Sequence, residues 1–453
     1  MTPRTALPAL ALLLAGCMGP RPPVPEGVTP PVAWRVETGP SVAIEHDWWQ
    51  SYGDPALTAL VGQALAQNDD VAVALARVRE ADAQARIARA ELFPTLDFAA
   101  GGTRARAINA FGQALTTNTG QLAFDASYEV DLFGRIHDAV GAARANLLAS
   151  EAARDTTILS VAAAAARGYI TLRALDAQLD VVRQTLASRA DALRLARDRT
   201  RAGYTSQLEY EQARAEYEST AQAVPQAELA VARQENALGV LIGNPDVAVI
   251  ARGMALQELR QPPVPEGLPS DLLRRRPDIA QAEYTLAASD ASLSAARKAY
   301  LPRIPLSASA GLVYATGLAN PVRVWSIGGS VLAPLFEGGR IVAGADAAAA
   351  RRDEAAYAYR RAALTAFREV NDNLAAVQKL EEQEARLRDQ RDALAAALRH
   401  ATNRYRAGYS PYLEQLDAQR QLFSAELNLI QTHTDRLNAG VALYQAMGGG
   451  WRP

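Results

Sequence analysis

The sequence predicts an α+β membrane protein built from two internal repeats, each combining a β-hairpin with long α-helices. Copies about two hundred residues long are too large for solenoid units, which favours a duplicated half-structure. Within each copy the hydrophobic pattern changes from a helical period to strict alternation. Six residues of the first copy recur in order in the second: Asp70, Val78, Asp82, Ala88, Arg89 and Pro94 correspond to Asp278, Leu286, Asp290, Ala296, Arg297 and Pro302.

Residues 1–16 have the features of a secretory signal peptide. Arg4 supplies a positive charge, an apolar stretch follows, and small residues precede Cys17, the only cysteine of the chain. This segment resembles a bacterial lipoprotein box, which implies cleavage before Cys17, lipidation of its sulfur and, with Met18 next, sorting to the outer membrane. An ordinary signal peptide with an incidental thiol is the alternative. Residues 17–47 are rich in proline and are expected to form a lipidated, extended N-terminal segment.

The first predicted hairpin lies at about 95–131, within repeat 1, which covers residues 48–250. Its second strand alternates apolar and polar side chains from Leu122 to Val130. One face therefore suits an apolar environment and the other suits water. The stretch from Gly101 to Gly120 is predicted to hold the connecting loop.

The second hairpin is predicted at about 303–335, within repeat 2, which covers residues 269–450. Strands of about ten residues cross a bilayer when tilted. No stretch after residue 16 has the roughly eighteen apolar residues of a membrane-spanning helix, so strands are expected to span the membrane. Four strands cannot close a barrel, and an open sheet edge is not tolerated in hydrocarbon. The barrel must therefore be shared between chains.

Very long helices are predicted after the hairpins, from about Ile136 to Thr200 and from about Ile341 to Tyr405. Return helices begin near Leu208 and Leu413. Apolar residues recur every seven positions in all four helices, which predicts coiled-coil packing.

Each helix pair reverses direction at an Arg-Ala-Gly-Tyr segment, at about 200–206 and again at about 405–411. The glycine suits the left-handed conformation that ends many helices. Proline-rich residues 251–268 are predicted to link the two repeats.

Charge and composition argue against an enzyme or a nucleic-acid-binding protein. The net charge of −2 provides no basic surface for nucleic acid. The four histidines are scattered without metal-ligand spacing and the glycine-rich stretches lack a P-loop lysine, so no catalytic site, metal or cofactor is predicted. Two other classes of protein share some of these features. A lipid-anchored periplasmic coiled-coil scaffold or adaptor without a pore would not need duplicated amphipathic hairpins, and a lipid-anchored hydrolase would lack any candidate triad.

Three segments carry a resemblance to a known family: Leu268–Leu273 followed by Arg276–Ile279, Asp131–Arg135, and Tyr412–Arg420. The chain resembles the outer membrane factor family, the TolC-like channel-tunnels of tripartite efflux pumps, in its NodT-type lipoprotein branch. This resemblance implies a homotrimer whose twelve-stranded β-barrel, with four strands per chain, continues as a long α-helical coiled-coil tunnel through the periplasm. It also implies a periplasmic adaptor of the membrane fusion protein type, an inner-membrane transporter of RND, ABC or MFS type, contact with outer membrane lipid, and passive conduction of drugs or other small molecules.

The resemblance further assigns roles to residues near the two turns. Leu413 and Asp417, one helical turn apart, match the positions of constricting rings at the periplasmic entrance. Nearby arginines are possible partners in a latch that holds the gate: Arg404, Arg406 and Arg420. The turns are expected to contact the adaptor through eight residues: Arg201, Gly203, Tyr204, Thr205, Arg406, Gly408, Tyr409 and Ser410.

Overall fold

The computed structural model describes residues 28–35, 44–108, 110–244, 250–264 and 269–452. Within these ranges the chain forms two compact units. The first unit contains Arg77–Glu151 and Gln281–Arg361, and the second contains Val28–Ala76, Ala152–Ala280 and Ala362–Pro453. The expected signal peptide and Cys17 lie outside the described residues.

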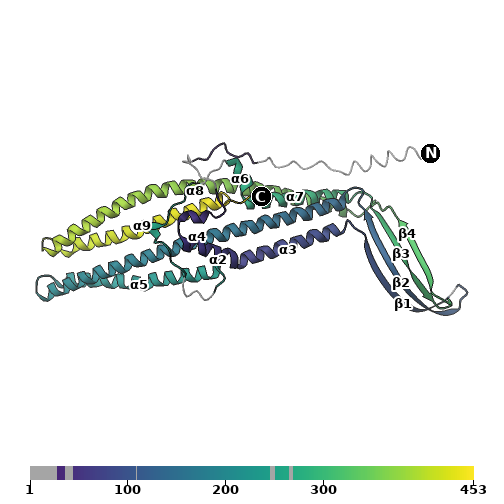
Figure 1. The fold of residues 1–453 in the computed structure, drawn as a ribbon, viewed down its shortest axis with the longest axis horizontal. Coiled ribbons are helices and arrows are strands. Elements are labelled where there is room, and N and C mark those ends of the chain that lie inside the picture. Colours follow the sequence, from purple (N-terminus) through teal and green to yellow (C-terminus); the bar gives the residue numbers. More distant parts are fainter. Residues whose placement is uncertain (1–27, 36–43, 109, 245–249, 265–268, 453) are drawn as a thin grey trace. The chain divides into compact units, whose positions relative to one another are not determined.

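The first unit contains one antiparallel sheet of four strands in the order β1-β2-β3-β4 (Figure 1). Pairing of β2 with β3 joins the hairpin of one repeat to the hairpin of the other. Strands β1 and β4 form the two edges, which are free to pair with neighbouring chains as a shared barrel requires. The strands are β1 (Thr95–Ile108), β2 (Ala114–Val130), β3 (Ile304–Ala315) and β4 (Val322–Gly329).

The connecting loop lies within Gly101–Gly120 as expected, but it is much shorter than that stretch. Gly101 pairs with Gln121 and Gly102 pairs with Gly120, so both strands continue through the glycines to a turn between Ile108 and Ala114. Glycine weakens a strand but does not end it when backbone pairing is available on both sides. At Gly311 of β3 the absence of a side chain is needed, because a Cβ atom would lie 2.1 Å from the backbone oxygen of Leu122.

The two faces of the sheet differ in polarity as the alternation predicts. Phe98 and Phe124 are cross-strand partners whose ring centroids lie 5.2 Å apart, and the same row continues to Ala310 and Trp325. The adjacent row, on the opposite face, contains Asp97, Asp125, Ser309 and Ser326. The aromatic side chains are exposed although they are apolar. Such a face is suited to contact with lipid.

Paired helices of equal length confirm the internal duplication. Helices α3 and α7 each have 22 residues, α4 and α8 each have 67, and α5 and α9 each have 35. Helices α3 and α7 end shortly before Pro94 and Pro302, respectively, because proline cannot continue a helix. The bounds are α3 Asp69–Ala90, α4 Arg135–Arg201, α5 Gln207–Leu241, α7 Pro277–Lys298, α8 Arg340–Arg406 and α9 Tyr412–Ala446.

The second unit has its hydrophobic core around the middle of α4. Tyr169 and Ile170 of α4 are fully buried in a cluster that also includes Leu57 of α2 and Leu437 of α9. The short elements of this unit are η1 (Trp48–Tyr52), α2 (Pro55–Gln67), η2 (Leu256–Glu258) and α6 (Pro269–Arg275).

One expectation about membrane helices is corrected by α4. Among the described residues this helix contains an 18-residue window of mean hydropathy 1.3, which is apolar enough by composition to cross a membrane. Half of that window is buried inside the structure, and Ala163 and Ala166 are fully buried in the core. The high hydropathy comes from alanines that let neighbouring helices approach closely, so this stretch is a core segment.

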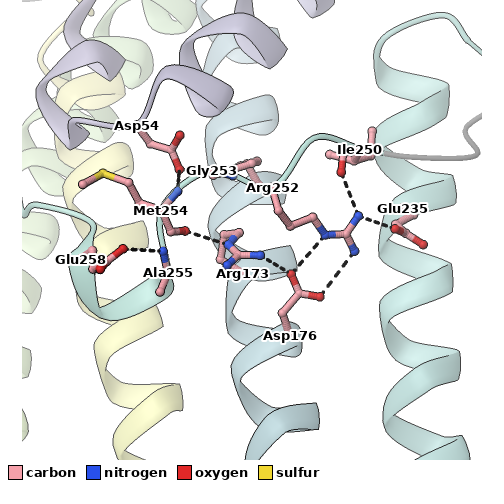
Figure 2. A network of polar contacts seen from close by, with 11 residues as sticks. Asp54, Arg173, Asp176, Glu235, Ile250, Arg252, Gly253, Met254, Ala255 and Glu258 are labelled. Atoms are coloured by element: carbon pink, nitrogen blue, oxygen red, sulfur yellow. Dashed lines mark hydrogen bonds and ion pairs between the residues drawn. The ribbon is translucent and has the colours of Figure 1, made fainter.

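A network of polar contacts holds residues 250–258, in the segment that follows α5, against α2, α4 and α5 itself (Figure 2). Asp54 caps α2 through the backbone N–H of Ala56 at 2.8 Å, and also accepts hydrogen bonds from the Tyr169 hydroxyl at 2.7 Å and the Met254 N–H at 2.9 Å. Arg252 contacts Asp176 of α4 at 3.2 Å. The segment is thereby fixed to α2 and α4.

Candidate functional site at the helix tips

Both long helix pairs reverse direction through the same backbone motif. Gly203 and Gly408 have φ angles of 77° and 78°. The backbone N–H of the following tyrosine donates to an oxygen five residues earlier, from Tyr204 to Arg199 and from Tyr409 to Arg404, each at 2.9 Å. This is the Schellman arrangement, which requires a left-handed residue that glycine adopts without strain.

The residues expected to contact an adaptor lie at these two turns. Tyr204 and Tyr409 are 82% and 81% exposed, which is unusual for large aromatic side chains. Thr205 is half-buried, and its hydroxyl lies 3.1 Å from that of Thr200. Ser410 is half-buried at the second turn. The remaining expected contact residues are exposed: Arg201, Gly203, Arg406 and Gly408.

Arg199, which the sequence did not single out, joins the two tips. Its guanidinium donates to the backbone oxygens of Tyr405 at 3.1 Å and Arg406 at 2.9 Å, and it lies 4.7 Å from the centroid of the Tyr405 ring. The last carbonyl groups of a helix have no partner within the helix and attract a cation. Arg199 of α4 therefore caps α8, and the Tyr405 ring in turn lies 5.5 Å from the Tyr412 ring.

The expected gate residues share one face of α9. Leu413 is 57% exposed, and the carboxylate of exposed Asp417 accepts a hydrogen bond of 2.6 Å from the side chain of Gln421. The preceding residues Tyr412 and Leu416 face about 100° away around the helix and are buried against α4, α5 and Tyr405 of α8. The face that carries Leu413 and Asp417 is thus left uncovered by the rest of the chain.

The expected latch arginines differ in their partners. Arg420 of α9 hydrogen-bonds Glu216 of α5, with its Nε 2.9 Å from Oε1. Arg404 lies 3.8 Å from Glu414, and both side chains are about half exposed, so this pair contributes little. Arg406 takes part through its backbone oxygen, which Arg199 contacts.

Glu216 lies at the centre of an ionic group that we call the Glu216 cluster: Arg189, Glu216, Thr220 and Arg420. Glu216 and Arg189 are 7% and 5% exposed, and Arg189 Nη1 lies 2.9 Å from Glu216 Oε2. Arg189 also donates to the Thr220 hydroxyl. The cluster connects α4, α5 and α9. Its contact between Arg420 and Glu216 joins the two helix pairs a few helical turns away from their tips.

Burial and charge in the Glu216 cluster shift several pKa values. Burial lowers the pKa of Arg189, and the negative charge of Glu216 opposes that shift. The hydrogen bond from Glu216 raises the pKa of Arg420. Burial, followed by the charge of Glu216, raises the pKa of Tyr412 to about 12. Arg189 follows the heptad residue Leu186 by three positions, so an ionic side chain at a coiled-coil core position was the available sequence signal.

Comparison with known proteins identifies the family. The profile of the outer membrane efflux protein family matches residues 60–244 and 268–449. The chain belongs to this family. The two matched segments coincide with the two repeats, so each repeat of the efflux protein carries its own match.

Individual efflux proteins support the same assignment. The toluene efflux pump outer membrane protein TtgC of Pseudomonas putida is 35% identical over 98% of this chain and 95% of its own length. The outer membrane protein OprJ of Pseudomonas aeruginosa is 37% identical over 89% of this chain and 86% of its own. Among solved structures, the outer-membrane channel OprN has a TM-score of 0.89 at 29% identity, covering 96% of this chain and 100% of OprN. The CmeC channel of Campylobacter jejuni has a TM-score of 0.88 at 27% identity, with coverages of 96% and 95%.

These findings establish the architecture and role of this efflux protein. It is the outer-membrane channel component of a tripartite efflux system and not an enzyme. Three chains with four strands each form the β-barrel in the outer membrane, which a helical tunnel continues into the periplasm. The channel works with a periplasmic adaptor and an inner-membrane pump. The alternatives of a scaffold without a pore and of a hydrolase are therefore set aside.

Proposed function

We propose that Leu413 and Asp417 form the periplasmic gate of this channel. The observation that carries the proposal is that Leu413 and Asp417 are exposed on one face of α9, whereas their immediate neighbours Tyr412 and Leu416 are buried. Around a threefold axis, one leucine and one carboxylate per chain would form an apolar ring and an acidic ring. An acidic ring at a constriction attracts cations and restricts other solutes.

The proposed latch that holds the gate consists of contacts between the two helix pairs. Arg420 contributes through Glu216, and Arg199 contributes by capping α8 beside Arg406. Arg404 adds at most a weak, solvent-screened contact to Glu414 at the second tip. Opening that moves α9 away from α5 would break the contact between Arg420 and Glu216.

The proposed adaptor contact lies at the tips, where Tyr204 and Tyr409 present large apolar surfaces with a polar end. The adaptor would be of the membrane fusion protein type, and the inner-membrane transporter of RND, ABC or MFS type. Relatives are named for efflux of toluene and antibiotics and for export of pyoverdine. This variety supports export of drugs or other small organic molecules by the present chain.

Lipid anchoring at Cys17 completes the proposal. Two or three acyl chains at about 0.8 kcal/mol per buried CH₂ hold a protein stably on a bilayer. Mass spectrometry of the mature N-terminal peptide should show a diacylglyceryl group on Cys17, which Cys17→Ser should abolish. An unmodified cysteine in the mature protein would contradict the anchor.

Conductance in planar bilayers tests the gate. Wild-type trimer should conduct weakly, and Asp417→Ala should raise the single-channel conductance or open probability because the acidic ring is removed. Asp435→Ala is the matched control, since Asp435 also lies exposed on α9 and accepts a 2.8 Å hydrogen bond from a glutamine four residues away, Gln431. Equal conductance of both variants and wild type would contradict the proposed gate.

A further inference from the structure

Charged residues are unevenly distributed along the strands. Between Asp97 and Asp125 the only charged residues are Arg104 and Arg106. Between Arg303 and Glu337 the only charged residue is Arg323. The part of the sheet next to the two hairpin turns therefore carries three positive charges per chain and no negative charge.

The strand register places all three arginines on the apolar face. Arg104 and Arg106 are separated from Phe98 by even numbers of residues along β1, so they point to the same side of the sheet. Arg323 is two residues from Trp325 in β4 and opposite Leu312 of β3. The apolar face contacts lipid in a barrel whose other face carries Asp97 and Asp125. The three arginines consequently point outward, away from the lumen.

The height of the apolar band locates these arginines relative to the bilayer. Outward-facing apolar rows run along β2 from Val130 opposite Ile304 to Gly120 opposite Tyr314. Five two-residue steps span about 34 Å of strand, or about 25 Å of height at a tilt of about 40°, which matches the apolar band of outer-membrane barrels. Arg104 and Arg106 lie in the next two rows. Arg323 lies in the row of Leu312, one row farther from the hairpin turns than Tyr314, and an arginine side chain is long enough to bring its charge from there to the membrane surface.

The direction of the sheet determines which leaflet the arginines meet. Helices α4 and α8 follow the ends of the strands that lie near Val130 and beyond Gly329, and these helices belong to the periplasmic tunnel. The turns after Ile108 and Ala315 are at the opposite ends of the strands. The arginines near those turns therefore lie at the outer surface of the membrane.

We propose that Arg104, Arg106 and Arg323, here called the arginine band, bind phosphate groups of lipids in the outer leaflet. A guanidinium group recognises phosphate through paired, charge-assisted hydrogen bonds. All three side chains are exposed, and no ion pair to them is found among the described residues. When strands β1 and β4 of neighbouring chains close the barrel, Arg323 of one chain lies beside β1 of the next, so the three arginines gather at each of the three junctions between chains.

Thermal unfolding of the purified trimer in detergent, titrated with lipid A, tests the band. Removing each arginine should raise the lipid A concentration needed for half-maximal stabilisation about fivefold. This corresponds to about 1 kcal/mol for a basic residue at an anionic surface. The variant R104Q/R106Q should thus need about 25-fold more lipid A, and R323Q about fivefold more. R104K/R106K keeps the charge and should retain most of the affinity.

Two controls separate phosphate recognition from other effects. Arg386→Gln removes an 88% exposed arginine from α8 and should leave the titration unchanged. Dephosphorylated lipid A should stabilise the wild-type trimer much less than lipid A does. The proposal is overturned if R104Q/R106Q and R323Q both titrate like wild type, if dephosphorylated lipid A is equally effective, or if inorganic phosphate alone reproduces the stabilisation. Should the double variant fail to assemble, R323Q and R104K/R106K decide the question.

Discussion

Replacing Glu216 by glutamine should loosen the contact between the two helix pairs near the tips. The substitution keeps the shape of the side chain but removes the negative charge that faces Arg189 and Arg420. Arg189 is 6% exposed at its side chain and would keep its positive charge in a buried position. Arg420 is 57% exposed and would be solvated by water instead.

The expected cost follows from these exposures. Removing one partner of a buried ion pair costs about 3–5 kcal/mol, and the hydrogen bonds that glutamine retains favour the low end, about 3 kcal/mol. The half-exposed pair with Arg420 contributes about 0.2–1 kcal/mol, so Arg420→Gln should have a smaller effect than Glu216→Gln. Arg189 and Glu216 belong to the same helix pair, so only the loss of the Arg420 contact biases the equilibrium between closed and open tips, by about 1.4- to fivefold for about 0.2–1 kcal/mol.

Two measurements on the same protein check this prediction. Thermal unfolding should show a lower midpoint for Glu216→Gln, and planar bilayers should show a higher open probability. Glu228→Gln is a matched control, because Glu228 of α5 also pairs with an arginine of α4, Arg183, at 2.8 Å, but both side chains are about half exposed. If Glu216→Gln and Glu228→Gln behave alike in both assays, the reasoning about the buried pair is refuted.

Two further predictions concern stability away from the tips. Tyr169→Phe removes a donor to Asp54 and an acceptor from the Gly253 N–H, and should cost about 1–3 kcal/mol in chemical denaturation, whereas an unchanged midpoint would contradict a structural role for this network. Although burial opposes it, hydrogen bonding by the His137 side chain and backbone holds the pKa of Asp131 below its ordinary value. The resulting stability is present above the unfolded pKa of Asp131 and is lost as the pH falls through its lowered folded pKa. Asp131→Asn should reduce this acid-side loss in unfolding titrations from pH 7 to pH 3, and an unchanged slope would argue against it.

The elements that the sequence predicted correctly are those with local physical causes. Strict alternation from Leu122 to Val130 identified β2, because side chains in a strand point alternately to its two faces. The glycines at positions 203 and 408 identified both tips, because a left-handed residue ends a helix wherever it occurs.

The errors arose where a local signal was outweighed by contacts between segments. The glycines at 101 and 120 suggested a longer loop than the one between Ile108 and Ala114, because backbone pairing continues the sheet through them. The alanine-rich stretch of α4 reaches the hydropathy of a membrane segment, which the prediction from sequence overlooked, although the expectation that no helix spans the membrane agrees with its packing in the core of the second unit. Neither outcome could be read from neighbouring residues alone.

The sequence by itself determined the duplication, the strands, the long helices and the turns between them, since each depends on periodicity or on the conformation of single residues. Only the tertiary structure decided which charges meet. Arg420 pairs with Glu216, more than two hundred residues away, and Arg199 caps a helix of the other repeat. Such contacts depend on the rotation and register of packed helices, which are set by the packing of the whole coiled coil.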